Sequence, residues 1–589
     1  MEDRHDRTRR ALDMAGVRPD NAAGLFDKKI AIHLDERWGN SFDGQMMATL
    51  LTNQLSRMCR YLTFVLPDET RLIGCVPQLT TEKYLKRALE NLVFEITGSF
   101  PSDRQEEYDL VYVIGNTPPA FKPAKPGHTL YLASEGWVGY VSENPIPGHD
   151  RPPAEEGNLF GAGVAATLAA SEGIKRLMGV SSLPLHAFTA FSAHSLKSSH
   201  KEIRLDPGPR LPDKIDFGNL VVCGTGAVGS AFVFLFPGLM YRGKSPAPCP
   251  FCEKQKGTCR ECGGSRLLAA YLPRSIEGRV FLLDRDFYDI TNLNRCLVAG
   301  NGQIGKSKAL ICQEFLRRYF PNEAQLFLSA HLDYEDFVRC LAGTAFVAFE
   351  STDSQRLKRD IQHTWWNGNL LVPEYLCSGG TSGFVPTVSN HVAGKTACLQ
   401  CKMGEPPRLS LQLAATLYQA ARKQNLGAFE SVEQAEFKLA DKKNRLECEH
   451  RQRESSPQDY GWNQAAVALS KEYGILGQNY SFDYPMIGDA ERALLNLGAG
   501  EPFPTIAPVS VFPALIGLGE VVKYACLDGE GMIDSLYDID LMYLSEKTRP
   551  FRIPVAPSCK CQKPEHKEAL ERRENLLAGN PENLPAFLK

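Results

Sequence analysis

Three glycines after an apolar run are the first residues whose spacing points to chemistry. Residues 220–222 read Leu-Val-Val, and Gly224, Gly226 and Gly229 follow in GxGxxG spacing before a further apolar run from Ala231. A strand that feeds such a loop presents backbone N–H groups at the N-terminus of a helix, which suits a nucleotide phosphate. The motif alone is weak, because the same glycines serve equally well to turn the chain.

Polar residues after the next expected strand make the motif more specific. Asp284 and Asp286 end that strand, and an acidic residue at this place reads a ribose hydroxyl in dinucleotide sites. Asn292, Arg295 and Lys308 come soon afterwards. A dehydrogenase has no use for this group of an amide and two cations, which argues against an NAD-dependent oxidoreductase.

This arrangement resembles the ThiF/MoeB and ubiquitin-activating enzyme superfamily, whose hallmark is D-x-D-x-V-x-x-S-N-L-x-R-Q followed by G-x-x-K. Here the hallmark stands as DRD at 284–286, TNLNRC at 291–296 and GKSK at 305–308. The resemblance covers roughly residues 216–400 and resumes at 500–527.

The resemblance implies an enzyme that uses Mg-ATP to adenylate the C-terminal carboxylate of a ubiquitin-like protein or sulfur carrier. Asp353, in the run Thr-Asp-Ser at 352–354, matches the family's magnesium-binding Asp, although an Asp there also suits a helix cap. Cys296 stands where the family has Gln, which removes one expected polar contact to the nucleotide. The residues expected to bind Mg-ATP are Gly224, Gly226, Gly229, Asp284, Asp286, Asn292, Arg295, Lys308 and Asp353, with Arg295, Lys308 and Asp353 also catalytic.

The composition of the chain argues against several other classes of function. The chain has 589 residues, 43% hydrophobic and 23% charged, which is ordinary for a globular protein of several domains. A net charge of −3 and a pI near 6.5 give no electrostatic reason to expect a nucleic acid or an anionic membrane as partner. The charged N-terminus lacks a signal peptide's apolar core, and no run approaches the ~18 apolar residues of a membrane span. We therefore expect a cytoplasmic protein that binds neither nucleic acid nor membrane.

Clustered cysteines in that compartment point to metal rather than to disulfides. Four follow C-x2-C-x6-C-x2-C spacing, which gives four thiolates the geometry of a closed, structural zinc site. The family resemblance implies a second zinc site from two distant knuckles, although the later one is C-x-C instead of the usual C-x2-C. The first group is Cys249, Cys252, Cys259 and Cys262, and the second is Cys398, Cys401, Cys559 and Cys561.

The first third of the chain echoes the remainder. Residues 29–34 (KIAIHL) parallel 219–224 (NLVVCG), and two similar apolar helices end in EGIK at 172–175 and EVVK at 520–523. We interpret this as a diverged duplication that keeps a nucleotide site in its second copy only, as in ubiquitin-activating enzymes. The alternative is two unrelated α/β domains with a common pattern. In that family an Arg of the inactive half reaches the ATP phosphates, and Arg37 is the nearest candidate.

Residues 402–500 carry helical patterns outside the expected sheet, where the family places a domain with a thioester-forming cysteine. Cys448 is the single cysteine between Cys401 and Cys526 and belongs to neither metal group. We expect it to carry the modifier before transfer to a conjugating enzyme. The alternative is a surface cysteine on a charged helix.

The expected fold is α/β: two tandem Rossmann-like adenylation halves in a pseudo-dimer, with a zinc-ribbon insertion and a helical cysteine-bearing insert. The expected function is activation of a ubiquitin-like protein, and the insertion is similar to that of activating enzymes from bacterial ubiquitin-like (Bil-type) antiphage operons. The alternatives are a sulfur-carrier adenylyltransferase without a thioester step, an NAD-dependent oxidoreductase, and a zinc-rich scaffold that binds nucleotide without turnover. The expected domains are 1–200 (inactive half), 201–401 (active half, with the insertion at 242–275), 402–500 (helical insert), 501–545 (closing part of the active half) and 546–589 (knuckle and tail).

Overall fold

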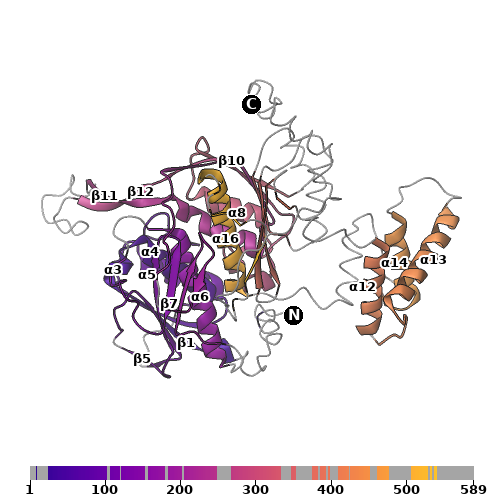
Figure 1. The fold of residues 1–589 in the computed structure, drawn as a ribbon, viewed down its shortest axis with the longest axis horizontal. Helices are drawn as coiled ribbons and strands as arrows, with labels where there is room; N and C mark the ends of the chain where they lie inside the picture. Colours follow the sequence, from indigo (N-terminus) through magenta and orange to yellow (C-terminus); the bar gives the residue numbers. More distant parts are fainter. Residues whose placement is uncertain are drawn as a thin grey trace, which may run out of the picture. The chain divides into compact units, whose positions relative to one another are not determined.

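The computed structural model divides the chain into two compact units, residues 1–399 with 505–589 and residues 400–504. Figure 1 shows the helices and strands of each unit. The structure describes residues 8, 24–101, 107–119, 121–152, 157–179, 184–201, 204–248, 267–332, 347–352, 375–382, 385–392, 396–397, 409–423, 425–450, 460–475, 506–527, 529, 531–533, 536–539 and 541.

The first unit contains two seven-stranded sheets, so the predicted mixed α/β class is confirmed. The first sheet has the order β2-β1-β4-β6-β7-β8-β9. Its first four strands are parallel, whereas β7, β8 and β9 each pair antiparallel with the preceding strand of that order. The alternation of strands and helices in the sequence predicted an entirely parallel sheet. That prediction is wrong for β7, β8 and β9. The strands are β1 Lys29–Leu34, β2 Tyr61–Val65, β4 Leu110–Ile114, β6 Thr129–Glu135, β7 Val138–Ser142, β8 Phe188–Ser192 and β9 Ser198–Ser199, with β3 Glu107–Tyr108 and β5 Lys122–Pro123 as a separate parallel pair.

The second sheet has the order β14-β13-β10-β15-β16-β17-β18. Its first five strands are parallel and follow the 3-2-1-4-5 order of the Rossmann fold, while β17 and β18 are antiparallel. The strands are β10 Lys214–Cys223, β13 Ser275–Leu283, β14 Leu326–His331, β15 Val347–Glu350, β16 Tyr375–Ser382, β17 Val385–Val392 and β18 Leu536–Asp538.

The two sheets share one plan, which supports the predicted duplication. In each, a central first strand (β1 or β10) leads into a helix (α4 or α7), and a long apolar helix (α6 or α16) follows the antiparallel strand β7 or β17 in sequence. The second half adds the edge strand β14. The helices of this unit are α3 Glu36–Gly39, α4 Phe42–Leu55, α5 Leu85–Thr97, α6 Leu159–Met178, α7 Ala227–Leu235, α8 Lys308–Arg317 and α16 Ala507–Cys526, with the 3-10 turns η1 Phe236–Met240, η2 Ile290–Asn292 and η3 Asn301–Gln303.

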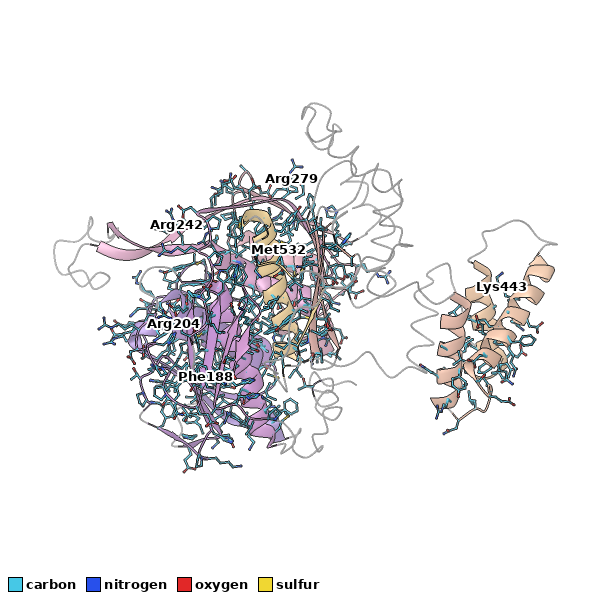
Figure 2. All side chains as sticks on the ribbon, in the orientation of Figure 1. Phe188, Arg204, Arg242, Arg279, Lys443 and Met532 are labelled. Carbon is cyan, nitrogen blue, oxygen red and sulfur yellow. The ribbon has the colours of Figure 1, made fainter. Side chains whose placement is uncertain are left out.

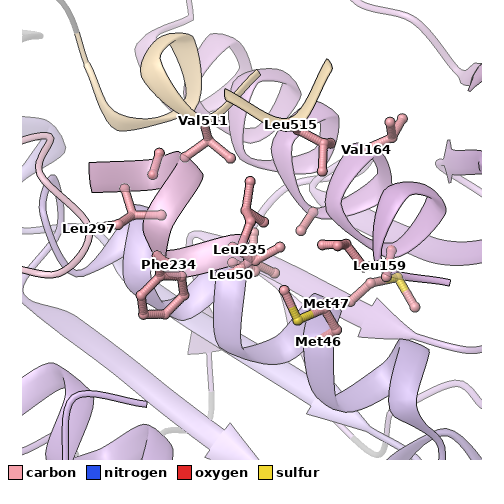
Figure 3. Packing of buried hydrophobic residues seen from close by; sticks show 14 of the residues in the cluster. Met46, Met47, Leu50, Leu159, Val164, Phe234, Leu235, Leu297, Val511 and Leu515 are labelled. Carbon is pink, nitrogen blue, oxygen red and sulfur yellow. The ribbon is translucent and has the colours of Figure 1, made fainter. Parts of the chain in front are cut away.

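Helices α4, α6, α7 and α16 pack together where the halves meet, and their buried side chains belong to one continuous core. Figure 3 shows Leu50 of α4, Val164 of α6, Leu235 of α7 and Leu515 of α16 in this packing. A Cβ on Gly163 of α6 would lie 2.7 Å from Leu515 Cδ1, so glycine permits this close approach of α6 and α16. The halves are thus joined by a shared hydrophobic core.

Each long apolar helix carries the same buried ion pair. On α6, Lys175 pairs with Glu172, and on α16, Lys523 pairs with Glu520 at 2.7 Å. Lys523 also donates to the carbonyl of Ala193 in the first half at 3.2 Å. The sequence repeat EGIK and EVVK is therefore structural, and its second copy helps to tie the halves together.

Helix α16 is, by length and composition, apolar enough to cross a membrane, with 20 residues and a mean hydropathy of 1.4. The sequence-based expectation that no segment approaches that length overlooked it, because Glu520 and Lys523 interrupt the apolar run. However, 83% of its apolar window is buried inside the protein. This burial is that of a core helix.

A two-stranded antiparallel ribbon, β11 Tyr241–Pro248 and β12 Leu267–Pro273, leaves the second half between η1 and β13. It projects away from the two sheets (Figure 1). Arg242 lies at its base (Figure 2) and pairs with Asp213 at 2.6 Å. Its last paired residues, Pro248 and Leu267, hold the ends of the connection that carries the first cysteine group.

The second unit consists of three described helices, α12 Leu409–Lys423, α13 Val432–His450 and α14 Tyr460–Glu472. They bury a small apolar core of their own, which includes Leu417, Leu439 and Leu469. Figure 2 labels Lys443, on α13, in this unit. The predicted thiol, Cys448, also lies on α13.

Candidate functional site

The strand order of the second sheet changes direction between β10 and β15. In open α/β sheets, ligands bind outside the carboxyl ends of the strands at such a point. Here Ser351, just after β15, donates its N–H to the carbonyl of Cys223 at 2.8 Å and its hydroxyl to the carbonyl of Gly224 at 2.7 Å. The GxGxxG loop therefore lies at the place where the fold expects a ligand.

Glycine stands at each of the three positions of this loop for a different physical reason. Gly224 has φ +84°, a conformation that favours glycine. A Cβ on Gly229 would lie 1.9 Å from the Gly224 oxygen, so no side chain fits at that position. Gly226 is the N-cap of α7 and provides no side-chain cap, and a Cβ there would meet nothing within 4 Å. Among the described residues, no side chain caps the N-terminus of α7 and none fills the space beside Gly226, which leaves N–H donors placed to suit a phosphate.

Asp284 fastens this loop to the end of β13. Its Oδ2 accepts hydrogen bonds from Thr225 N–H at 2.7 Å and Thr225 hydroxyl at 3.2 Å, and its Oδ1 accepts from Asp286 N–H at 2.9 Å. Burial raises the pKa of this carboxyl above its ordinary value, whereas the charge of Lys308 opposes the rise. Asp284, which is predicted to bind the ribose, therefore also holds the loop in place.

Lys308 and Asp286 form an ion pair next to this carboxylate. Lys308 Nζ lies 3.3 Å from Asp286 Oδ2, and the side chains are 11% and 52% exposed. Lys308 is the first residue of α8, and its N–H donates to the Asp286 carbonyl at 3.0 Å. Phe287 and Ser307 pair as an isolated bridge that aligns the two segments. The motif acids and the motif lysine therefore meet despite their separation in sequence.

Asn292 and Arg295 lie in and just after the 3-10 turn η2. The Asn292 side chain accepts from Asp289 N–H at 3.4 Å as part of a capping box. Arg295 Nη1 donates to the Thr291 carbonyl at 2.8 Å and to Asn294 Oδ1 at 2.7 Å. These bonds fix the turn that carries two of the residues predicted to bind Mg-ATP.

Arg57 also belongs to this region, although it was not among the residues predicted from the sequence. It lies in the first half, is 1% exposed, and donates to three backbone carbonyls just after Asn292. In sequence it reads as one more charge near the end of an amphipathic helix, and no pattern distinguishes it. Arg37, the predicted arginine of the first half, is exposed on α3.

Several predicted residues fall outside the described part of the chain: Asp353, next to the described Thr352, and all eight predicted zinc ligands. The side chain of Cys448 is likewise not described. Among the described residues, no group of three or more His, Cys, Asp or Glu is placed to hold a metal ion. Cys296 and Cys377, which would be the next candidates for a reactive thiol if Cys448 did not carry the modifier, are both buried.

Fold and site together define a Rossmann-type α/β protein made of two fused halves, of which the second keeps an open phosphate-type loop beside a Lys–Asp pair. Residues 263–562 match the model of the ThiF family. Because that match covers just over half of the 589 residues, the protein belongs to the ThiF family. The resemblance found in the sequence is confirmed.

Relatives of known name match only parts of the chain. The uncharacterized protein y4jF of Sinorhizobium fredii is 22% identical over 302 residues, which are 51% of this chain and 47% of that protein. The NEDD8-activating enzyme E1 catalytic subunit of Saccharomyces cerevisiae is 27% identical over 157 residues, 24% of this chain and 49% of that protein. The chain thus spans about half the length of these relatives. The crystal structure of E. coli MccB with MccA-N7isoASN is 14% identical, with a TM-score of 0.31 over 59% of this chain and 67% of that one.

Proposed function

We propose that this protein is a cytoplasmic activating enzyme that adenylates the C-terminus of a ubiquitin-like protein with Mg-ATP. The observation that carries the proposal is the uncapped N-terminus of α7 at the switch point, with the Lys308–Asp286 pair beside it. A phosphate bound at such a helix end gains from the N–H donors and the helix dipole. The yeast relative, named as a NEDD8-activating enzyme, supports the choice of substrate class.

In this proposal the carboxylate of the modifier attacks the α-phosphorus of ATP, and pyrophosphate leaves. The N–H groups of α7 hold the phosphates, and Lys308 and Arg295 stabilise the charge that develops there. Asp284 holds the loop and is proposed to bind the ribose, with Asp286 beside it. Asp353 is proposed to bind Mg²⁺, which would neutralise the phosphates and the leaving pyrophosphate.

The second step proposed is capture of the modifier as a thioester on Cys448, followed by transfer to a conjugating enzyme. The two-half architecture and the separate helical unit support this step. The alternative, a sulfur-carrier adenylyltransferase, would stop at the adenylate. A role in bacterial antiviral defence belongs to the same proposal and rests on the cysteine-bearing insertion alone.

Adenylation is tested by ATP–pyrophosphate exchange. Each candidate ubiquitin-like acceptor is supplied with a free or an amidated C-terminus. Exchange is expected only with the free carboxylate. Arg295→Ala, Lys308→Ala and Asp353→Ala are each expected to lower the rate by roughly 10²-fold or more, since each removes a positioned charge. The matched control is Lys306→Ala, which removes an exposed lysine of the same segment. Exchange at the wild-type rate in all three variants would reject the site.

The thioester step has its own test. Incubation with modifier and Mg-ATP is expected to give an adduct on a non-reducing gel that thiol reverses. Cys448→Ser should abolish the adduct, or convert it to a thiol-resistant ester, while pyrophosphate exchange persists. Cys526→Ser is the control, because burial raises the pKa of that thiol to about 11 and disfavours the nucleophilic thiolate. A thiol-sensitive adduct that survives in Cys448→Ser would place the nucleophile elsewhere.

Zinc is proposed at the two cysteine groups, as structural sites without an open ligand position. Elemental analysis of the purified chain is expected to find two zinc ions. The double variant Cys249→Ser/Cys252→Ser should retain one, since it removes half of the ligands at the end of the β11–β12 ribbon. If the wild-type chain held one zinc ion and this variant held none, the proposed second site would be rejected. That site consists of Cys398, Cys401, Cys559 and Cys561.

A further inference from the structure

A buried arginine of the first half forms hydrogen bonds to the backbone of the segment that carries Arg295. Arg57 lies just after α4 and is 1% exposed. Its Nη1 donates to the carbonyl of Leu293 at 2.6 Å, and its Nη2 donates to the carbonyls of Leu297 at 3.0 Å and Ala299 at 3.1 Å. Because the guanidinium is planar and rigid, it fixes these three carbonyls relative to one another.

The anchors lie on both sides of Arg295. Leu293 and Leu297 are each two residues away from it in sequence. Between η2 and η3 the backbone forms single turns, such as the bond from Arg295 N–H to the Asn292 carbonyl at 3.1 Å, and no helix or strand, so side-chain anchors share in setting its conformation. The position of Arg295 therefore depends on a side chain from the other half.

The same segment is also bound to the helix that follows the glycine loop. Leu297 N–H donates to the hydroxyl of Ser230, on α7, at 3.2 Å. Asn53 of the first half donates to the Leu297 carbonyl at 3.1 Å and accepts from Arg57 Nε at 2.9 Å. Figure 3 shows Leu297 beside α7, with Phe234 and Leu235. Glycine loop, Arg295 segment and first half thus form one connected unit.

We propose that Arg57 is a positioning residue: it acts through Arg295 and keeps that side chain in register with the phosphate site on α7. This inference rests on the proposed function. Burying a charge is expensive, and packed apolar side chains often stabilise an interface equally well. What distinguishes Arg57 is that its three carbonyl acceptors all lie in the segment that carries Arg295. Its burial there is explained by the geometry it imposes on that segment. The first half, which has no glycine loop of its own, then contributes to nucleotide binding through this residue.

The test measures the Kd for Mg-ATP of the full chain by titration calorimetry, together with the thermal midpoint. Arg57→Lys keeps the charge and loses the planar fork. We expect it to raise the Kd roughly tenfold. The decisive measurement is a double-mutant cycle with Arg295→Ala: if Arg57 acts through Arg295, the double variant should bind no more weakly than Arg295→Ala alone.

Arg274 offers a matched control. It is 6% exposed and donates to the backbone carbonyls of Leu239 and Tyr241, but it lies just before β13, at the other end of that strand from Asp284. Arg274→Lys should lower the thermal midpoint and leave the Kd unchanged. Should Arg57→Lys fail to fold, Asn53→Ala removes one anchor of the same unit and is expected to raise the Kd less, again without adding to Arg295→Ala.

The outcomes separate the two proposals. A wild-type Kd in Arg295→Ala would reject the site itself and this inference with it. Weak binding in Arg295→Ala with a wild-type Kd in Arg57→Lys would reject only the inference. Effects of Arg57 and Arg295 on the Kd that multiply would show that Arg57 acts independently of Arg295, and would also reject the inference.

Discussion

The two halves treat the same helix end in opposite ways. In the second half, Gly226 leaves the N-terminus of α7 without a side-chain cap. In the first half, the corresponding helix α4 is capped by Ser41, whose hydroxyl accepts from Gly44 N–H at 3.0 Å, and Asp43 adds a carboxyl group in the first turn. Donors that are free for a phosphate in one half are already used by the protein in the other.

The space next to that helix end is also filled in the first half. Trp38 is fully buried, and a Cβ on Gly115, after β4, would lie 2.5 Å from its ring. The glycine in the first turn is nevertheless kept in both halves. A Cβ on Gly44 would lie 2.1 Å from the Trp38 oxygen, as a Cβ on Gly229 would lie 1.9 Å from the Gly224 oxygen. The comparison teaches that a Rossmann half can lose its site by filling it while its backbone plan persists.

Removing the filling residue should have the largest effect on stability. Trp38→Ala is expected to lower the free energy of unfolding by about 3–5 kcal/mol, because it leaves a large buried cavity. Binding should stay at one Mg-ATP per chain, since Ser41 still caps α4. Trp38→Phe should cost much less: among the described residues, Trp38 Nε1 has no hydrogen-bond partner to lose. Denaturant titration and calorimetry measure both quantities. A second bound ATP in Trp38→Ala would contradict this comparison.

Gly229 and Gly44 occupy equivalent positions, but substituting them should affect different properties, nucleotide binding in the second half and stability in the first. Gly229→Ala should weaken Mg-ATP binding by roughly 10²-fold or more, because its Cβ forces the phosphate loop to move. Gly44→Ala meets an equal clash with the Trp38 backbone and should cost about 1–3 kcal/mol of stability, with binding retained in the folded fraction. Equal losses of binding in both variants would show that the halves are not distinct.

The buried carboxyl group of Asp43, in the first half, is expected to make the free energy of unfolding depend on pH. Burial raises the pKa of this carboxyl to about 7, against hydrogen bonds from Ser134 and Asn158 that lower it. The folded protein therefore keeps a proton that the unfolded chain loses near pH 3.9, and the free energy of unfolding should fall as pH rises from about 4 to 7, by at most ~1.4 kcal/mol per pH unit. Asp43→Asn, which preserves both contacts, should flatten this slope in denaturant titrations. An unchanged slope would refute the assignment.

The smallest expected effects on stability come from exchanging the N-cap residues of α7 and α4, Gly226 and Ser41. Gly226→Ser should stabilise the protein by a few tenths of a kcal/mol and weaken Mg-ATP binding, because the new hydroxyl competes for the same N–H donors. Ser41→Gly should cost a similar few tenths in the first half and leave binding unchanged. Thermal unfolding and calorimetry measure the pair. Tighter ATP binding in Gly226→Ser would be the contrary result.

Much of this site was predictable because its chemistry is local. Gly224, Gly226 and Gly229 have spacing typical of a strand–loop–helix turn, which the structure contains, and Asp286 and Lys308, which the motif assigned to one site, lie side by side. The duplicated plan was also visible, since the two long apolar helices end in the same buried Glu–Lys pair.

The remainder depends on contacts between distant residues. Nothing in the sequence shows that Trp38 fills the first half's crevice, or that Arg57 reaches residues 293–299 across the interface. Strands β6 and β7 are joined by the two residues Gly136 and Trp137 and pair antiparallel, but residues 130–142 read in sequence as one strand-like run. Such features arise from packing, which sequence periodicity does not encode.

The shared core of the two halves has a consequence for synthesis on the ribosome. Helix α6 ends at Met178, and its packing partner α16 begins at Ala507. At ~5–20 residues per second, the intervening residues 179–506 take roughly 15–65 s to translate. During that interval the face of α6 that receives Leu515 is uncovered in the nascent chain. The first half therefore completes its folding only when nearly the whole chain has been made, and until then α6 presents an apolar surface to chaperones and to neighbouring nascent chains.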